Sequence, residues 1–181
     1  MPTRPLGLTL WELLLTLLIA SIVLGIGVPS WQTFALDARR TADINGFVLA
    51  VQLARSEAAK RGHAVVVCAS LDRERCSADG LRLTAGWIVF DNEDGVRPPQ
   101  RSPAEALLHV YQPTLEGTIT ANRPFFEFQV NYLRRSVNGT VVFCDSRGAR
   151  AARAVIVSYT GRPRVDGVAP GGGPLRCAGL P

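Results

Sequence analysis

The residue most able to do chemistry near the start of the chain is a single carboxylate inside a long apolar run. From residue 8 to residue 28 the chain has 21 residues, and Glu12 is the only charged one among them. As a helix that rises about 1.5 Å per residue, this run would be about 31 Å long, enough to cross the hydrocarbon core of a bilayer. A carboxylate inside such a span is costly unless it has a partner, so Glu12 predicts a functional contact.

A cleaved secretory signal peptide is the alternative interpretation of this apolar run. Such a peptide has a basic start, a short apolar core and small residues at its cleavage site. Here one arginine precedes a long core, and the Val28-Pro29-Ser30-Trp31 segment that ends it is a poor cleavage site. The run therefore favours a transmembrane helix that stays in the mature protein.

A second candidate for chemistry is an arginine-rich segment in the last quarter of the chain. From residue 134 to residue 181, eight arginines stand against two acidic residues, a net charge of +6, whereas residues 8–133 carry −2. Within this segment, Gly161-Arg162-Pro163-Arg164 follows a predicted strand. The glycine permits a tight exit from the strand, and the proline stiffens the loop between the two guanidinium groups.

This spacing predicts that Arg162 and Arg164 contact successive phosphates of a nucleic acid. Such contacts hold the backbone without reading bases, so binding would be non-specific and sensitive to salt. An ordinary solvated turn is the alternative interpretation. Five further arginines could widen the basic surface, although the sequence does not place them on one face: Arg134, Arg135, Arg147, Arg150 and Arg153.

The cysteines and histidines do not form a recognisable metal-binding or catalytic motif. None of the four cysteines forms a C-x-x-C pair, and the two histidines lie outside the spacings of zinc ligands. The chain also lacks a phosphate-binding glycine loop and a G-x-S-x-G segment. We therefore expect no enzymatic activity, no metal and no cofactor.

One long helix is predicted from about residue 8 to residue 61. Its second half is amphipathic, and Gly62 is expected to end it, with basic residues in the last turn. We expect the apolar side of this half to pack on the protein's own domain. That side consists of Trp31, Phe34, Ala38, Ile44, Phe47, Val48, Val51, Ala54 and Ala58.

Short β-rich runs separated by turn residues follow the helix, and no second long helical pattern lies between them. The class is therefore α+β with an antiparallel sheet. Residues 168–174, which contain three consecutive glycines, are expected to be flexible. The expected strands are 64–69, 86–90, 107–111, 117–120, 125–129, 140–144 and 154–159.

The N-terminal residues resemble a type IV prepilin signal, because a short leader ends in Gly7 and an apolar helix with Glu12 follows directly. The resemblance implies that a prepilin peptidase cleaves between Gly7 and Leu8 and that Leu8 is then methylated. Glu12 would neutralise the N-terminal amine of a neighbouring subunit during assembly, and Pro29 lies where pilin helices usually kink. Leu8 departs from the usual phenylalanine, and Leu6 from the usual basic residue.

Three further segments resemble minor pilins and pseudopilins of the FimT/GspH type: residues 53–58, 65–68 and 86–91. The resemblance covers about the first 95 residues well and the remainder loosely. It implies a type IV pilin-like fold, with a long N-terminal helix followed by an antiparallel β-sheet or sandwich. The G-R-P-R segment is similar to the G-R-x-R motif of minor pilins that bind DNA in natural transformation.

The resemblance divides the chain into a leader (1–7), a transmembrane or filament-core helix (8–28), an amphipathic half-helix (29–62) and a periplasmic β-rich domain (63–181). The protein is then expected in the bacterial inner membrane, with a single span and the C-terminal domain in the periplasm, and later in a filament. In that oxidising compartment we expect disulfides, and we favour the pairs Cys68–Cys76 and Cys144–Cys177.

The expected partners are other pilins or pseudopilins, the prepilin peptidase, the inner membrane before assembly, and double-stranded DNA. The leading hypothesis is a minor pilin that binds DNA during uptake. One alternative is a GspH-like pseudopilin of a type II secretion system that never contacts DNA. Another is a subunit that initiates pilus assembly and binds an acidic partner through its arginines.

Overall fold

The computed structural model of the protein describes residues 9–129 and 137–177, and the chain divides into two compact units between Ala38 and Arg39. One helix, α1 (Leu10–Arg61), has residues in both units. At its start the Thr9 hydroxyl accepts a hydrogen bond from the main-chain N–H of Glu12, at 3.3 Å. At its end Gly62 has a φ of +80° and donates to the carbonyl of Ala58, which confirms the predicted stop.

The part of α1 in the first unit is long and apolar enough to cross a membrane, with a mean hydropathy of 2.3 over its most apolar window. The expectation that Trp31, Phe34 and Ala38 pack on the protein's own domain is wrong, because all three are exposed, Trp31 to 71% and Phe34 to 63%. These residues belong to the N-terminal unit rather than to the unit that contains the sheets. The main chain of α1 is helical at residue 29.

The second unit contains two four-stranded sheets in which all neighbouring strands are antiparallel, as the α+β expectation requires. In the first sheet the order is β3 (Leu107–Tyr111), β2 (Trp87–Asn92), β1 (Ala64–Ala69), β5 (Phe125–Phe128). In the second the order is β4 (Gly117–Ala121), β6 (Gly139–Asp145), β7 (Arg153–Val157), β8 (Pro163–Asp166). A short 3-10 helix, Gly148–Arg150, lies between β6 and β7.

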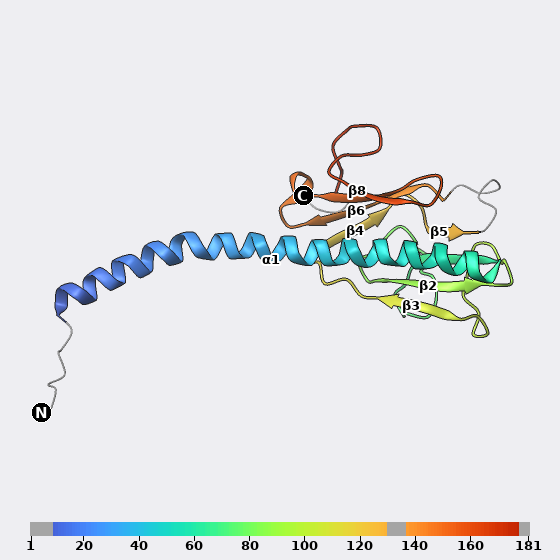
Figure 1. Ribbon diagram of the computed structural model, residues 1–181, viewed down its shortest axis with the longest axis horizontal. Coiled ribbons are helices and arrows are strands. Elements are labelled where there is room, and N and C mark those ends of the chain that lie inside the picture. Colours follow the sequence, from blue (N-terminus) through green and yellow to red (C-terminus); the bar gives the residue numbers. More distant parts are fainter. Residues whose placement is uncertain (1–8, 130–136, 178–181) are drawn as a thin grey trace, which may run out of the picture. The chain divides into compact units, whose positions relative to one another are not determined.

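The second half of α1 forms the centre of the hydrophobic core of this unit, and Figure 1 shows it running alongside strands of both sheets. Phe47 is fully buried, and its ring makes edge-to-face contacts with Trp87, Phe126 and Phe143 at centroid distances of 5.5, 5.6 and 6.4 Å. These three partners lie on β2, β5 and β6. One helical residue therefore contacts strands of both sheets. Aromatic pairs of this geometry stabilise a core beyond their buried area.

A buried carboxylate fixes α1 to the segment between β3 and β4. Asp43 accepts the main-chain N–H groups of Thr114 and Leu115, at 3.0 and 2.7 Å, and the hydroxyl of Tyr111 at 3.1 Å. Burial, together with the nearby Asp43 carboxylate, raises the pKa of Tyr111 to about 12. The tyrosine hydroxyl is therefore protonated at neutral pH and donates to the helix.

The outer face of the second sheet is covered by the C-terminal segment. Leu175 is buried against Ala154 and Ile156 of β7, and the Cys144–Cys177 disulfide ties the segment to β6. Residues 168–174 were expected to be flexible, but they form a turn closed by a bridge between residues 168 and 174. The second disulfide joins Cys68 to Cys76, so both bonds connect the cysteines that the sequence paired.

Candidate nucleic-acid interface

The hairpin between β7 and β8 carries the G-R-P-R segment. Gly161 has a φ of +73° and donates its N–H to the carbonyl of Ser158 at 2.9 Å, while Ser158 donates to the carbonyl of Arg162, also at 2.9 Å. This is a short hairpin loop in which a left-handed glycine follows the turn. The Arg162 N–H donates to the Ser158 hydroxyl at 3.1 Å. Both main-chain polar groups of Arg162, its N–H and its carbonyl, are therefore hydrogen-bonded.

The sequence placed this segment in a loop after the last strand, and the structure corrects that expectation. Pro163 and Arg164 begin β8, which is the edge strand of its sheet. An edge position tolerates proline, because the missing N–H faces away from the neighbouring strand. Arg164 pairs with Ile156 and lies on the outer face of the sheet, whereas the neighbouring Val155 contributes to the core.

Both arginine side chains are accessible to a ligand. Arg162 is exposed and forms no ion pair with any residue in the described parts of the chain. The side chain of Arg164 is 63% exposed, and its contact with Asp166 is loose, at 3.9 Å between Nη2 and Oδ2. Such a surface pair contributes little to stability and can be exchanged for a ligand at small cost. Arg164 also lines an open groove of about 460 Å³ with Asn122, Thr140 and Pro170.

The hairpin is packed tightly on the rest of the unit at Gly161, the residue before Arg162. Gly161 is buried, and a Cβ atom built at this position would lie 3.0 Å from Cε1 of Phe128 and 3.3 Å from Cδ of Arg55. A side chain there would be both crowded and strained, because φ lies in the left-handed region. From the sequence, only the tight turn indicated why a glycine is needed at position 161. The structure adds that a side chain there would collide with its neighbours, and this close packing holds the hairpin arginines at a defined place.

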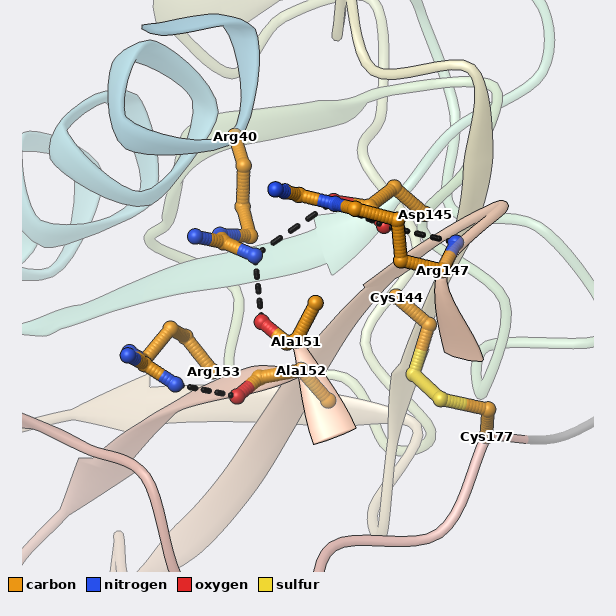
Figure 2. Close-up of polar contacts among 8 residues, drawn as sticks. All are labelled: Arg40, Cys144, Asp145, Arg147, Ala151, Ala152, Arg153 and Cys177. Atoms are coloured by element: carbon orange, nitrogen blue, oxygen red, sulfur yellow. Dashed lines mark hydrogen bonds and ion pairs between the residues drawn. A yellow bond between two sulfur atoms is a disulfide. The ribbon is translucent and has the colours of Figure 1, made fainter. Parts of the chain in front are cut away.

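Arg147 lies in a buried charge cluster at the other end of β6 (Figure 2). Its Nε and Nη2 atoms donate to the two carboxylate oxygens of Asp145, at 3.0 and 2.6 Å. Arg40 of α1 reaches the same carboxylate at 3.4 Å and also donates to the carbonyl of Ala151. Hydrogen bonds from Arg147, with the nearby charge of Arg40, hold the pKa of Asp145 below its usual value.

The remaining predicted arginines do not join the hairpin in one cluster. Arg150 is exposed at the end of the 3-10 helix, and Arg153 opens β7, where its guanidinium donates to the carbonyl of Ala152 at 3.0 Å. Arg153 is four strand residues from Val157, which pairs with Pro163, so about 13 Å separates it from the hairpin. Arg134 and Arg135 lie outside the described residues, as do Gly7 and Leu8.

Glu12 lies far along the chain from these arginines, at the third helical position of α1, and it is exposed. The Thr9-Leu10-Trp11-Glu12 segment has the threonine and glutamate spacing of a capping box, a signal that the sequence interpretation missed. A carboxylate in the first turn also interacts favourably with the helix dipole. The helix start at this point therefore has a local physical cause.

The fold defines the class of the protein: a long N-terminal helix followed by two antiparallel sheets is the architecture of type IV pilin-like subunits. The family model of the type II transport protein GspH matches residues 43–161, and the chain belongs to this family. It is thus a subunit of the minor pilin and pseudopilin class, whose members are structural proteins.

Among solved structures, two crystal forms of the type IV minor pilin FimU from Pseudomonas aeruginosa strain PAO1 share the fold, each with a TM-score of 0.51. The form in space group P65 is 17% identical over 76% of this chain and 96% of FimU. The form in space group P21 is 19% identical over 81% of this chain and 96% of FimU. No curated protein matches the sequence.

Proposed function

We propose that the protein is a minor pilin of a type IV pilus that binds duplex DNA non-specifically through Arg162 and Arg164 during DNA uptake. The observation that carries the proposal is the pair of exposed guanidinium groups beside Gly161, which is buried in the same hairpin. Arg162 has no carboxylate partner in the described chain, and that of Arg164 is 3.9 Å away. Arginine binds phosphate bidentately, and a preorganised loop loses little entropy on binding.

A structural pseudopilin of a type II secretion system is the second candidate function, and the name of the matching family model favours it. In that role the protein would contact other subunits and would not bind DNA. The two candidates share the helix and the fold, so only the behaviour of the hairpin arginines separates them.

DNA titration of the full chain in a neutral detergent tests the proposal. We expect wild-type affinity in the micromolar range or weaker, falling as salt rises from about 50 to about 200 mM. The Arg162→Ala/Arg164→Ala variant should bind at least about tenfold more weakly at the lower salt concentration. Its plot of log K against log salt should be shallower by about 1.8, because two phosphate contacts are lost.

The matched control removes the same charge from the same segment at exposed positions away from the hairpin, with Arg150→Ala/Arg176→Ala. If binding depends on net charge alone, this control will lose as much affinity as the hairpin variant. That outcome, or the absence of wild-type binding at low salt, would leave the pseudopilin role as the better conclusion.

We propose further that a prepilin peptidase removes residues 1–7, that Leu8 is methylated, and that the protein spans the inner membrane once before assembly. The apolar helix with an exposed Glu12 near its start supports this processing. A C-terminal domain in the periplasm agrees with the two disulfides. During assembly Glu12 pairs with the N-terminal amine of a neighbouring subunit, and Pro29 shapes the helix for packing.

Mass spectrometry of the mature protein should find a chain that begins at Leu8 and carries one additional methyl group. The Gly7→Val variant should remain uncleaved. The Glu12→Gln variant should be cleaved normally but absent from sheared filaments, because an uncharged amide cannot neutralise the neighbouring amine. A mature chain that begins elsewhere, or filaments that incorporate Glu12→Gln as well as wild type, would contradict this assignment.

A further inference from the structure

We infer that Arg55 of α1 is a third cation of the nucleic-acid site and binds a phosphate on the helix side of the β7–β8 hairpin. This inference rests on the proposed DNA-binding function and adds a residue that no linear motif contains. It follows from three observations: where the Arg55 side chain lies, the absence of a carboxylate partner, and the placement of the three arginines around one hairpin.

The aliphatic part of Arg55 lies against the hairpin tip. Its Cδ is 3.3 Å from the position that a Cβ on Gly161 would occupy, and Phe128 lies on the same side of the glycine. Arg162 follows Gly161 directly, and consecutive Cα atoms are about 3.8 Å apart. The Cδ atom of Arg55 is therefore within about 9 Å of the Cα of Arg162, although the two residues are far apart in sequence.

Among the described residues, the guanidinium group of Arg55 has no anionic partner, unlike the other arginines of the same helix. Arg39 pairs with Glu116, Arg40 with Asp145, and Arg61 with both Glu57 and Asp91. No ion pair joins Arg55 to any residue in ranges 9–129 and 137–177, and its Nε is buried without a hydrogen-bond partner. A buried charged donor without an acceptor is unfavourable, so an anion supplied from outside would complete this site.

The three arginines approach the hairpin from different sides. Arg164 lies on the outer face of the second sheet, in register with Ile156, whereas Arg55 comes from the helix beneath the buried Gly161. Arg162 lies at the turn between them. A phosphate backbone that crosses the hairpin tip would meet Arg164 on one side, Arg162 at the tip and Arg55 on the other. Each guanidinium can bind one phosphate through two parallel N–H groups.

The test compares variants of Arg55 in the full chain, in neutral detergent, with a fluorescently labelled DNA duplex as the probe. Arg55→Met keeps a long stem to pack beside Gly161 and Phe128 but removes the charge. We expect its affinity at about 50 mM salt to fall about three- to tenfold and its salt dependence to be shallower by about 0.9. Arg55→Lys should retain most of the affinity, because a point charge also attracts phosphate.

The control is Arg150→Met, which removes an exposed arginine that forms no ion pair within the described residues and lies at the other end of the second sheet. Arg55→Gln is a second charge-free variant, and thermal unfolding shows which of the two variants keeps the wild-type fold. If both bind as well as Arg150→Met while the Arg162→Ala/Arg164→Ala variant is defective, Arg55 is not part of the site and DNA binding by the hairpin stands. If wild type itself does not bind, the proposed function and this inference fall together.

Discussion

Replacing Asp145 with alanine should lower the free energy of unfolding by about 3–5 kcal/mol, because it removes a buried carboxylate that pairs with the guanidinium groups of Arg40 and Arg147. Asp145 is fully buried, and only 7% of Arg40 is exposed. The carboxylate also receives the Nε, Nη2 and main-chain N–H groups of Arg147 (Figure 2). Removing this acceptor breaks two sets of contacts. One is the ion pair between α1 and the end of β6, and the other is the set of hydrogen bonds that hold the turn after β6.

Denaturant unfolding of the Asp145→Ala protein measures this effect, with Asp166→Ala as the control. Asp166 makes a loose, exposed contact with Arg164, so its loss should cost less than about 1 kcal/mol. A difference of under about 1 kcal/mol between the two variants would show that the charge cluster does not hold the helix.

The contribution of Asp145 should also depend on pH. Its pKa is lowered in the folded protein, chiefly by hydrogen bonds from Arg147, whereas an unfolded aspartate titrates at about 3.9. The unfolded state therefore binds the proton more readily, and the stabilisation is fully present above that value. The stability difference between wild type and Asp145→Asn should be constant near neutral pH and should shrink as the pH falls below about 4.

Removing the Cys144–Cys177 disulfide should destabilise the protein by about 3.8 kcal/mol, from the loop entropy that the bond removes from the unfolded chain. The bond closes a sequence separation of 33 residues, whereas Cys68–Cys76 closes only 8, for which the same relation predicts about 2.5 kcal/mol. Leu175 packs near the bond on the outer face of β7, so loss of the bond also loosens that cover.

The measurement is denaturant unfolding of Cys144→Ala/Cys177→Ala beside Cys68→Ala/Cys76→Ala. Alanine is the right replacement because Cys144 is fully buried, and a serine would place a hydroxyl in an apolar site. The longer loop should cost more. If the Cys68→Ala/Cys76→Ala protein proves the less stable of the two, then loop length does not govern the effect of these bonds.

Much of the fold could be predicted because local signals agree with tertiary packing. The helix ends at Gly62 as expected, and strands such as β1, with Val65, Val66 and Val67 in succession, combine high β-propensity with complete burial. Strand β8 could not be predicted, since Pro163-Arg164-Val165-Asp166 is only four residues long and contains proline and aspartate, which are rare in strands. Pairing with the buried strand β7 determines its conformation, and an edge position tolerates the proline.

The candidate site could be predicted only as far as it is local in sequence. The G-R-P-R segment is visible in the chain, but the arginine-rich segment does not reveal that Arg147 is bound to Asp145. Arg40 and Asp145 are 105 residues apart, and nothing in the sequence pairs them. Arg55 likewise reads as a solvated helix residue, because its position under Gly161 depends on how the hairpin packs on the helix.

Strands β4 and β5 follow each other in the chain but belong to different sheets, and this affects how the protein unfolds. β4 joins the second sheet, and β5, the next strand in the chain, returns to the first sheet beside β1. Neither sheet is therefore built from one continuous segment, and neither can detach and keep its strands. We therefore expect the sheets to unfold as one cooperative unit, so that damage at the outer face of the second sheet also weakens the strands that hold the helix.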